Sequence, residues 1–237
     1  MTAPTTQISL DHREQVDSYW ADFLGCTPAT LYRGGDTITY RNTSPGLFCL
    51  EIGDSRILSL ARGISVRPPC GPLNEDWIYR VLAKKGPVGE VYGPGDVFYV
   101  TTDTFEPVNE NICKPLKDTD QNILNQFATL AQWRCEFPNQ TLSWTHAFGI
   151  YQDGKLVSAA TTIVWSNTIA AVKVATLTDY RGRGYGRAVT SAVTSTILNE
   201  TRLIPQYDTE TSNYPSQQIA RGLGFQPYGR IYYGKLK

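Results

Sequence analysis

The sequence predicts a mixed α/β protein, and three observations support this prediction. Apolar residues recur at helical spacing; in the first such stretch they are Val16, Tyr19, Trp20 and Phe23. Short apolar-rich runs bounded by glycine and other turn residues have the length of strands. At 41% hydrophobic and 11% aromatic residues, the 237-residue chain has enough apolar side chains for a sizeable core.

The first hundred residues combine helices and strands. Residues 47–52 and 56–61 are expected to be strands, joined across Gly53-Asp54 as a hairpin. Thr27 before Pro28 is typical of a helix start, with a capping residue and proline at the first helical position. The remaining elements expected here are the helix that ends at Gly25, strands at 37–40 and 97–101, and a helix at 73–82 closed by Gly86.

A polar stretch at 102–111 is typical of a linker, and we therefore predict two domains, 1–105 and 106–237. In the second domain the dipeptide Asp153-Gly154 predicts a hairpin, because its turn needs positive φ at both residues. The strands expected there are 112–116, 146–151, 155–165, 169–177, 202–208 and 228–236, and the helices are 120–133, 186–199 and 215–223.

Charge and composition exclude several classes of protein. Lys+Arg and Asp+Glu both number 22, so the chain lacks the basic excess of a nucleic-acid or membrane-surface binder. It has neither a signal-peptide pattern nor the roughly 20 apolar residues that a membrane span needs. The five scattered cysteines include no C-x-x-C pair, which favours reduced thiols over disulfides or a metal site. We expect a soluble, cytoplasmic protein without a metal.

A glycine-rich turn carries the chemistry. The run Arg181-Gly182-Arg183-Gly184-Tyr185-Gly186-Arg187 follows a predicted strand and opens a predicted helix. The first turn of a helix presents unpaired N–H groups and a partial positive charge, and glycines let a phosphate approach the backbone. Three arginines add charge suited to phosphate oxygens. The turn therefore predicts a diphosphate site, although a glycine-rich turn that binds nothing is the alternative.

Two common phosphate motifs do not fit. The dinucleotide fingerprint needs G-x-G-x-x-G, whereas glycine here stands at every second position. The nucleotide P-loop needs Gly-Lys-Ser/Thr, which is absent from this sequence.

The second half resembles the GCN5-related N-acetyltransferase (GNAT) family. The strand-ending run from Thr176 through Tyr180 to Gly186 is similar to the family's cofactor motif, R-x-x-G-x-G. A second segment, in which Asn213 and Ser216 are followed by Gly224-Phe225, resembles its N-x-x-[AS]…G-F motif. The resemblance spans residues 110–237. It implies a mixed, mostly antiparallel sheet flanked by helices, and the first hundred residues are then an additional N-terminal α/β unit.

The resemblance also implies a co-substrate, acetyl-CoA or another acyl-CoA. Its pantetheine arm is expected to pair with the backbone of Val174, Ala175 and Thr176, where the family's sheet is split. The residues from Arg181 to Arg187 would hold the pyrophosphate through amides and positive charge. Asn213 has the position that contacts the pantetheine arm, and as the residue before Tyr214-Pro215 it is equally suited to capping a helix.

Transfer to an amine requires a proton acceptor for the amine and a donor for the leaving thiolate. Many relatives place a tyrosine donor seven residues after the asparagine, but this chain has Ala220 there. Ser216 is then the candidate donor, with a small packing residue as the alternative; Tyr214, Tyr228 and Tyr232 are further candidates. Asp208 is the candidate base, with a solvated strand end as the alternative.

The resemblance implies an N-acetyltransferase acting on a small-molecule or peptide amine by direct transfer. A protein that binds acyl-CoA without catalysis is the alternative, because of Ala220. Residues 1–105 are either a degenerate copy of the same fold or an unrelated unit that shapes the acceptor site. The sequence leaves a homodimer open.

Overall fold

The computed structural model of the chain describes residues 10–41, 46–108, 110–131 and 143–237. These residues form two compact units, and the chain passes from one to the other more than once. The first unit contains Tyr99–Tyr207 and Pro215–Gln226. The second contains Ser9–Phe98, Asp208–Tyr214 and Pro227–Lys237.

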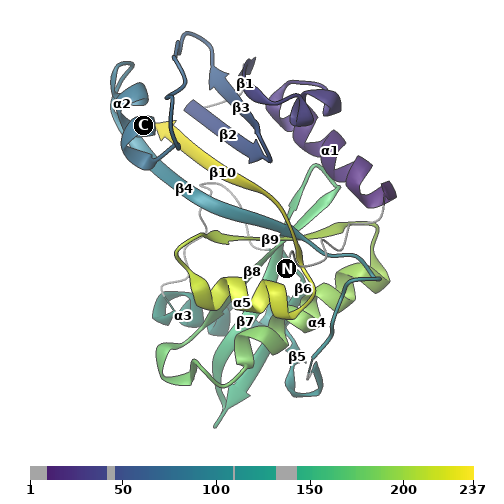
Figure 1. Cartoon of the computed structure of the whole chain (residues 1–237). Coiled ribbons are helices and arrows are strands. Elements are labelled where there is room, and N and C mark those ends of the chain that lie inside the picture. Colours follow the sequence, from purple (N-terminus) through teal and green to yellow (C-terminus); the bar gives the residue numbers. More distant parts are fainter. Residues whose placement is uncertain (1–9, 42–45, 109, 132–142) are drawn as a thin grey trace. The chain divides into compact units, whose positions relative to one another are not determined.

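In the second unit, strands from both ends of the chain form one sheet, in the order β1-β3-β2-β10-β4 (Figure 1). The strands are β1 (Gly35–Arg41), β2 (Gly46–Ile52), β3 (Ser55–Ala61), β4 (Val88–Tyr99) and β10 (Gln226–Leu236). The predicted β2–β3 hairpin is confirmed as an antiparallel pair around Gly53, whose φ is +53°. β10 pairs antiparallel with β2, from Arg230↔Glu51 to Lys235↔Gly46.

The helices of this unit have the predicted places. They are α1 (Leu10–Leu24), the short 3-10 helix η1 (Pro28–Tyr32) and α2 (Glu75–Ala83). Asn74 caps α2, accepting a hydrogen bond from the Trp77 N–H at 2.9 Å. The buried Asp17 of α1 accepts hydrogen bonds from the hydroxyls of Tyr32 at 2.6 Å and Tyr228 at 2.7 Å. This carboxylate therefore joins α1, η1 and β10.

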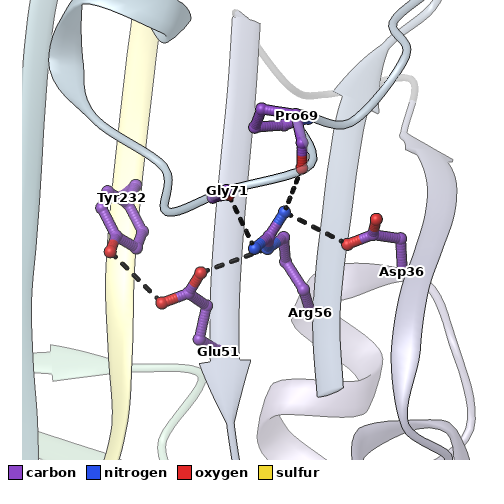
Figure 2. A network of polar contacts seen from close by, with 6 residues as sticks. All are labelled: Asp36, Glu51, Arg56, Pro69, Gly71 and Tyr232. Atoms are coloured by element: carbon purple, nitrogen blue, oxygen red, sulfur yellow. Dashed lines mark hydrogen bonds and ion pairs between the residues drawn. The ribbon is translucent and has the colours of Figure 1, made fainter. Parts of the chain in front are cut away.

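Arg56 fastens a loop to the same sheet (Figure 2). Its guanidinium contacts the carboxylates of Glu51 at 3.2 Å and Asp36 at 3.4 Å. It also donates to the carbonyl oxygens of Pro69 and Gly71, each at 3.2 Å. The planar fork of an arginine can reach all of these acceptors at once, so one side chain links three strands to the loop before α2.

In the first unit the strand order is β9-β8-β7-β6-β5 (Figure 1). The strands are β5 (Lys114–Pro115), β6 (Ser143–Gln152), β7 (Lys155–Trp165), β8 (Ile169–Thr176) and β9 (Ile204–Glu210), of which Ile204–Tyr207 lie in this unit. The β6–β7 turn confirms the hairpin prediction, since φ is +49° at Asp153 and +77° at Gly154. The fold class is thus as predicted, a mixed and mostly antiparallel sheet with helices.

The helices of the first unit are α3 (Gln121–Leu130), α4 (Tyr185–Glu200) and α5 (Tyr214–Gly222), with short 3-10 turns at η2 (Glu110–Ile112), η3 (Asp118–Asp120) and η4 (Thr178–Tyr180). α4 packs on β6, β7 and β8, and half of its residues are buried. The helix predicted at 120–133 ends earlier than expected at Leu130, and Trp133 lies outside the described residues.

The stretch predicted as a linker is packed into the first unit. The Glu106 N–H donates to the Leu223 carbonyl oxygen at 3.1 Å, and the Val108 N–H donates to the Ser191 hydroxyl at 3.0 Å. Ser191 in turn donates to Glu110 at 2.7 Å. The prediction of a linker is therefore wrong, because backbone and carboxylate groups of this polar stretch bind α4 and the end of α5. The division into domains 1–105 and 106–237 stays a prediction.

Two further findings bear on the expected class of protein. No helix in the described parts of the chain is long and apolar enough to cross a membrane. Cys26, Cys49, Cys70 and Cys113 are free thiols, and Cys135 lies outside the described residues.

Candidate functional site

The candidate site begins where β8 and β9 part. β8 pairs antiparallel with β7 along its whole length, up to Ser158↔Thr176. Its other edge pairs with β9 in parallel from Ile169↔Ile204 only as far as Val172↔Tyr207. Within the described residues, Val174, Ala175 and Thr176 therefore continue β8 beyond the β8–β9 ladder. Such an edge can accept an extended ligand through main-chain hydrogen bonds.

The glycine-rich turn follows this edge after the short 3-10 turn η4. Gly182 and Gly184 have φ of +74° and +80°, and a Cβ built on either would meet no atom within 4 Å. Glycine is needed there for its backbone conformation, and the space outside both residues is open. Gly184 occupies the N-cap position of α4 but has no side chain, so the helix start is not capped by a side-chain hydrogen bond. Among the described residues, no acceptor pairs with the N–H groups of Tyr185, Gly186 and Arg187, so the helix start offers an anion site.

Two arginines lie on the exposed side of the turn. Arg181 Nε donates to the Thr176 carbonyl oxygen at 3.2 Å, and Arg183 Nη2 donates to that of Asp179 at 3.2 Å. The Arg183 guanidinium also lies over the Tyr180 ring, 5.2 Å from its centroid. Their charge is held beside the unpaired amides, where an anion would be attracted.

Arg187, the third arginine of the motif, is placed differently. Its guanidinium donates to the Gly222 carbonyl oxygen at the end of α5. A Cβ at Gly222 would come within 3.0 Å of the Arg187 Cζ. The side chain therefore links α4 to α5, and the residue contributes its backbone amide to the turn.

Gly186 lies close to both α5 and the edge strand. A Cβ at Gly186 would lie 3.2 Å from Ile219 Cδ1 of α5 and 3.2 Å from Thr176 Oγ1 of β8. Ser216 precedes Ile219 by three residues and so lies on the same face of the helix. Its hydroxyl is 2.9 Å from that of Tyr207, a buried residue of β9. The structure thus gathers Ser216, Thr176 and the helix start around the split.

Sequence reasoning missed Tyr207. In the sequence it is one of several aromatic residues in predicted strands, and nothing marks it as functional. Its partner Ser216 was recognised only by family position. No spacing rule joins the two, because the segment between them, 208–214, leaves the unit before α5 returns.

Asp208 and Asn213 lie in the second unit, and their roles stay predictions. Within that unit Asp208 acts electrostatically on Tyr19: burial raises the pKa of this phenol above its usual range, and the Asp208 charge raises it further. Asn213 directly precedes α5, the position expected of a capping residue, and its N–H donates to the Glu210 carbonyl oxygen at 3.0 Å.

The other candidate donors have distinct surroundings. Ala220 is fully buried and has no hydroxyl to offer. Tyr214 is 72% exposed. In the second unit, Tyr228 donates to Asp17 and Tyr232 donates to Glu51 at 3.2 Å, so both hydroxyls are engaged with carboxylates.

A split sheet edge beside an uncapped, glycine-rich helix start is the arrangement expected of an acyl-CoA-dependent transferase. The sequence model of the GNAT acetyltransferase family matches residues 105–232, more than half of the chain. The chain therefore belongs to the GNAT acetyltransferase family.

Two solved structures are similar to this chain, and the first of them supports the fold. A GNAT-family protein from Novosphingobium aromaticivorans is 19% identical, with a TM-score of 0.50 over 63% of this chain and 66% of that one. A GCN5-related N-acetyltransferase from Kribbella flavida is 16% identical, with a TM-score of 0.48 over 77% of this chain and 68% of that one. The chain thus spans just under two thirds of the Novosphingobium protein. No curated protein matches this sequence.

Proposed function

We propose that the protein is an N-acetyltransferase that transfers the acetyl group of acetyl-CoA to a primary amine of a small molecule or peptide. The observation that supports this most directly is the β8 edge at Val174–Thr176 running into an open, uncapped helix start. Pantetheine would extend along the edge, and the pyrophosphate would accept hydrogen bonds from the amides of Gly182 to Arg187. Metal ions are not required by this scheme.

The chemistry is direct transfer within a ternary complex. The amine nitrogen attacks the thioester carbonyl, and the C–S electron pair leaves with sulfur. Ser216 would donate a hydrogen bond to the sulfur, and Asp208 would accept the proton that the amine loses. A thiol intermediate on the enzyme is disfavoured at Cys113, because burial raises the pKa of this thiol to about 11 and keeps it protonated.

A variant with a matched control tests the cofactor site. In Gly184→Asp the new side chain enters open space at the start of α4, where a carboxylate suits the helix but repels a diphosphate. Asp also tolerates positive φ better than most residues. The control is Gly154→Asp, in a hairpin turn with φ of +77° and equally open surroundings. We expect both to fold, and only Gly184→Asp to weaken CoA binding, by tenfold or more.

An acyl-CoA-binding protein without catalysis is the second candidate, favoured by Ala220 at the usual donor position. Thiol release from acetyl-CoA with a panel of amines, amino acids and peptides separates the two. Turnover supports the transferase. Thermal stabilisation by CoA without turnover on any acceptor supports the binding protein, and absence of stabilisation by any acyl-CoA contradicts both.

A further inference from the structure

The hydroxyls of Tyr207 and Ser216 form a pair. The proposed mechanism gives Ser216 a role and does not yet use Tyr207. Their oxygens are 2.9 Å apart, and either can donate. Tyr207 is only 1% exposed, and its ring packs edge-to-face on Phe225, with 5.7 Å between centroids. A phenol held by its ring in this way has little freedom to turn its hydroxyl elsewhere.

The pair lies where the strands separate. Tyr207 is the partner of Val172 in the last β8–β9 pair. Ser216 shares a helix face with Ile219, whose Cδ1 lies 3.2 Å from a Cβ built at Gly186, and Thr176 Oγ1 lies 3.2 Å from the same point. The serine is therefore paired with a fixed phenol of β9 and lies on the α5 face that packs on Gly186, the glycine next to the end of the β8 edge.

We propose that Tyr207 is a positioning residue for Ser216. Tyr207 donates its hydrogen to the Ser216 oxygen, and Ser216 donates its own hydrogen to the sulfur of CoA. A hydroxyl that accepts one hydrogen bond donates a stronger one, because the two bonds polarise each other. This inference rests on the proposed function, since the sulfur is at Ser216 only if the thioester binds along β8.

The step balances without another reactant. As the tetrahedral adduct collapses, the C–S bond breaks and its electron pair goes to sulfur, where the Ser216 hydrogen bond stabilises the thiolate. The amine gives up one proton in becoming an amide, and the thiolate takes up one proton in becoming CoA. Tyr207 undergoes no net change and contacts no reacting atom.

Tyr99 provides a matched control. Its hydroxyl donates to Gln206 Oε1 at 2.6 Å, and both residues are buried in the same unit. Gln206 directly precedes Tyr207 on β9, so its side chain lies on the opposite face of the strand. Tyr99→Phe therefore removes a buried hydroxyl of the same kind without touching Ser216.

The test titrates the thiol of CoA bound to the whole protein, followed by thiolate absorbance. A hydrogen bond to sulfur favours the thiolate, so we expect the wild-type protein to lower the thiol pKa of bound CoA by about one unit. Ser216→Ala should abolish the shift, and Tyr207→Phe should remove about half of it. The double variant should match Ser216→Ala, and Tyr99→Phe should match the wild type.

Each outcome decides a separate point. CoA that binds with the thiol pKa of free CoA, or a Tyr207→Phe effect that persists in the Ser216→Ala background, overturns the positioning role and leaves the proposed function intact. If Tyr99→Phe reduces the shift of the thiol pKa as much as Tyr207→Phe does, the reduction comes from general loosening of the unit. That result also overturns the positioning role of Tyr207. Failure of the wild type to bind CoA overturns the proposed function, and the inference with it.

Steady-state kinetics with any amine that the enzyme acetylates provide a second test of the role of Tyr207. Tyr207→Phe should lower kcat about tenfold and leave KM for acetyl-CoA within about twofold, because the lost interaction is made mainly in the transition state. A rise in KM with unchanged kcat would instead indicate a packing role and contradict the proposal.

Discussion

Gly224 shows how one residue can fix the end of a helix. Its φ is +82°, and a built Cβ would lie 1.7 Å from the Thr104 carbonyl oxygen. Positive φ alone costs a non-glycine residue about 1 kcal/mol. The overlap with backbone adds to this cost, because neither segment can move without losing the Glu106–Leu223 hydrogen bond.

We therefore expect Gly224→Ala to lower the free energy of unfolding by more than about 3 kcal/mol. Gly154→Ala is the control, since φ there is +77° and nothing lies within 4 Å of a built Cβ. It should cost about 1 kcal/mol. Urea denaturation measures both variants, and equal losses would contradict the role given to the Thr104 contact.

Tyr232 makes stability sensitive to alkaline pH. Burial, followed by the charge of Glu51, raises the pKa of this phenol from 10.0 to about 12. The folded state thus favours the neutral phenol, and its contribution to stability is complete below about pH 10. That contribution is lost as the pH rises through about 12.

We expect the urea midpoint to fall over this pH range and to fall less steeply in Tyr232→Phe. Tyr40→Phe, at a side chain that is 56% exposed, is the control and should follow the wild-type curve. Parallel curves for the wild type and Tyr232→Phe would show that other groups cause the alkaline loss.

At the level of single residues, the sequence predicted backbone requirements better than side-chain partners. Gly182 and Gly184 of the turn have positive φ, a conformation that glycine adopts without strain. Arg187 was expected at the phosphates, but its guanidinium binds the end of α5. A charge pattern shows which side chains are available, whereas their partners depend on tertiary packing.

Secondary-structure elements were predicted well wherever local periodicity is clear. Both hairpins formed at their turn dipeptides, and α1, α2, α4 and α5 appeared near their expected positions. β4 was expected only at 97–101 but runs from Val88 to Tyr99. Its Gly93-Pro94-Gly95 run reads as a turn in the sequence, because proline is rare inside strands.

Arg56 decides how firmly the loop before α2 is held. Lysine at this position would keep the charge but could not reach two carboxylates and two carbonyls together (Figure 2). We expect Arg56→Lys to cost roughly 1–3 kcal/mol and to speed tryptic cleavage after Arg62 and Arg67.

The control for Arg56 is Arg230→Gln. Arg230 makes an ion pair with Asp96 at 3.0 Å, and its side chain is 46% exposed. Exposed pairs contribute less than about 1 kcal/mol, so this variant should change neither stability nor cleavage of the loop appreciably. An unchanged cleavage rate in Arg56→Lys would contradict the fastening role of the guanidinium.

At the scale of the whole molecule, the family match and the compact units divide the chain differently. The match covers residues 105–232 and ends within β10. Most of β10 nevertheless belongs to the second unit, where it lies between β2 and β4. The sequence could not predict this, because a strand's pattern shows its buried face and not its partner, and β2 lies far away in the chain.

Because β10 pairs with β2, we predict that the proposed domains 1–105 and 106–237 do not fold independently. The fragment 1–105 lacks β10, so β2 loses the pairs from Gly46↔Lys235 to Glu51↔Arg230, and Asp17 loses the Tyr228 hydroxyl. An interior strand supplies hydrogen bonds and apolar cover that loops cannot replace. We expect each fragment alone to lack a cooperative thermal transition, whereas the two produced together should co-purify and regain it.

A control cut at Asp153-Gly154, in the exposed hairpin turn of the first unit, should yield halves that associate without loss of the second unit's transition. If residues 1–105 unfold cooperatively on their own, β10 is dispensable, and the boundary at residue 105 separates two autonomous domains.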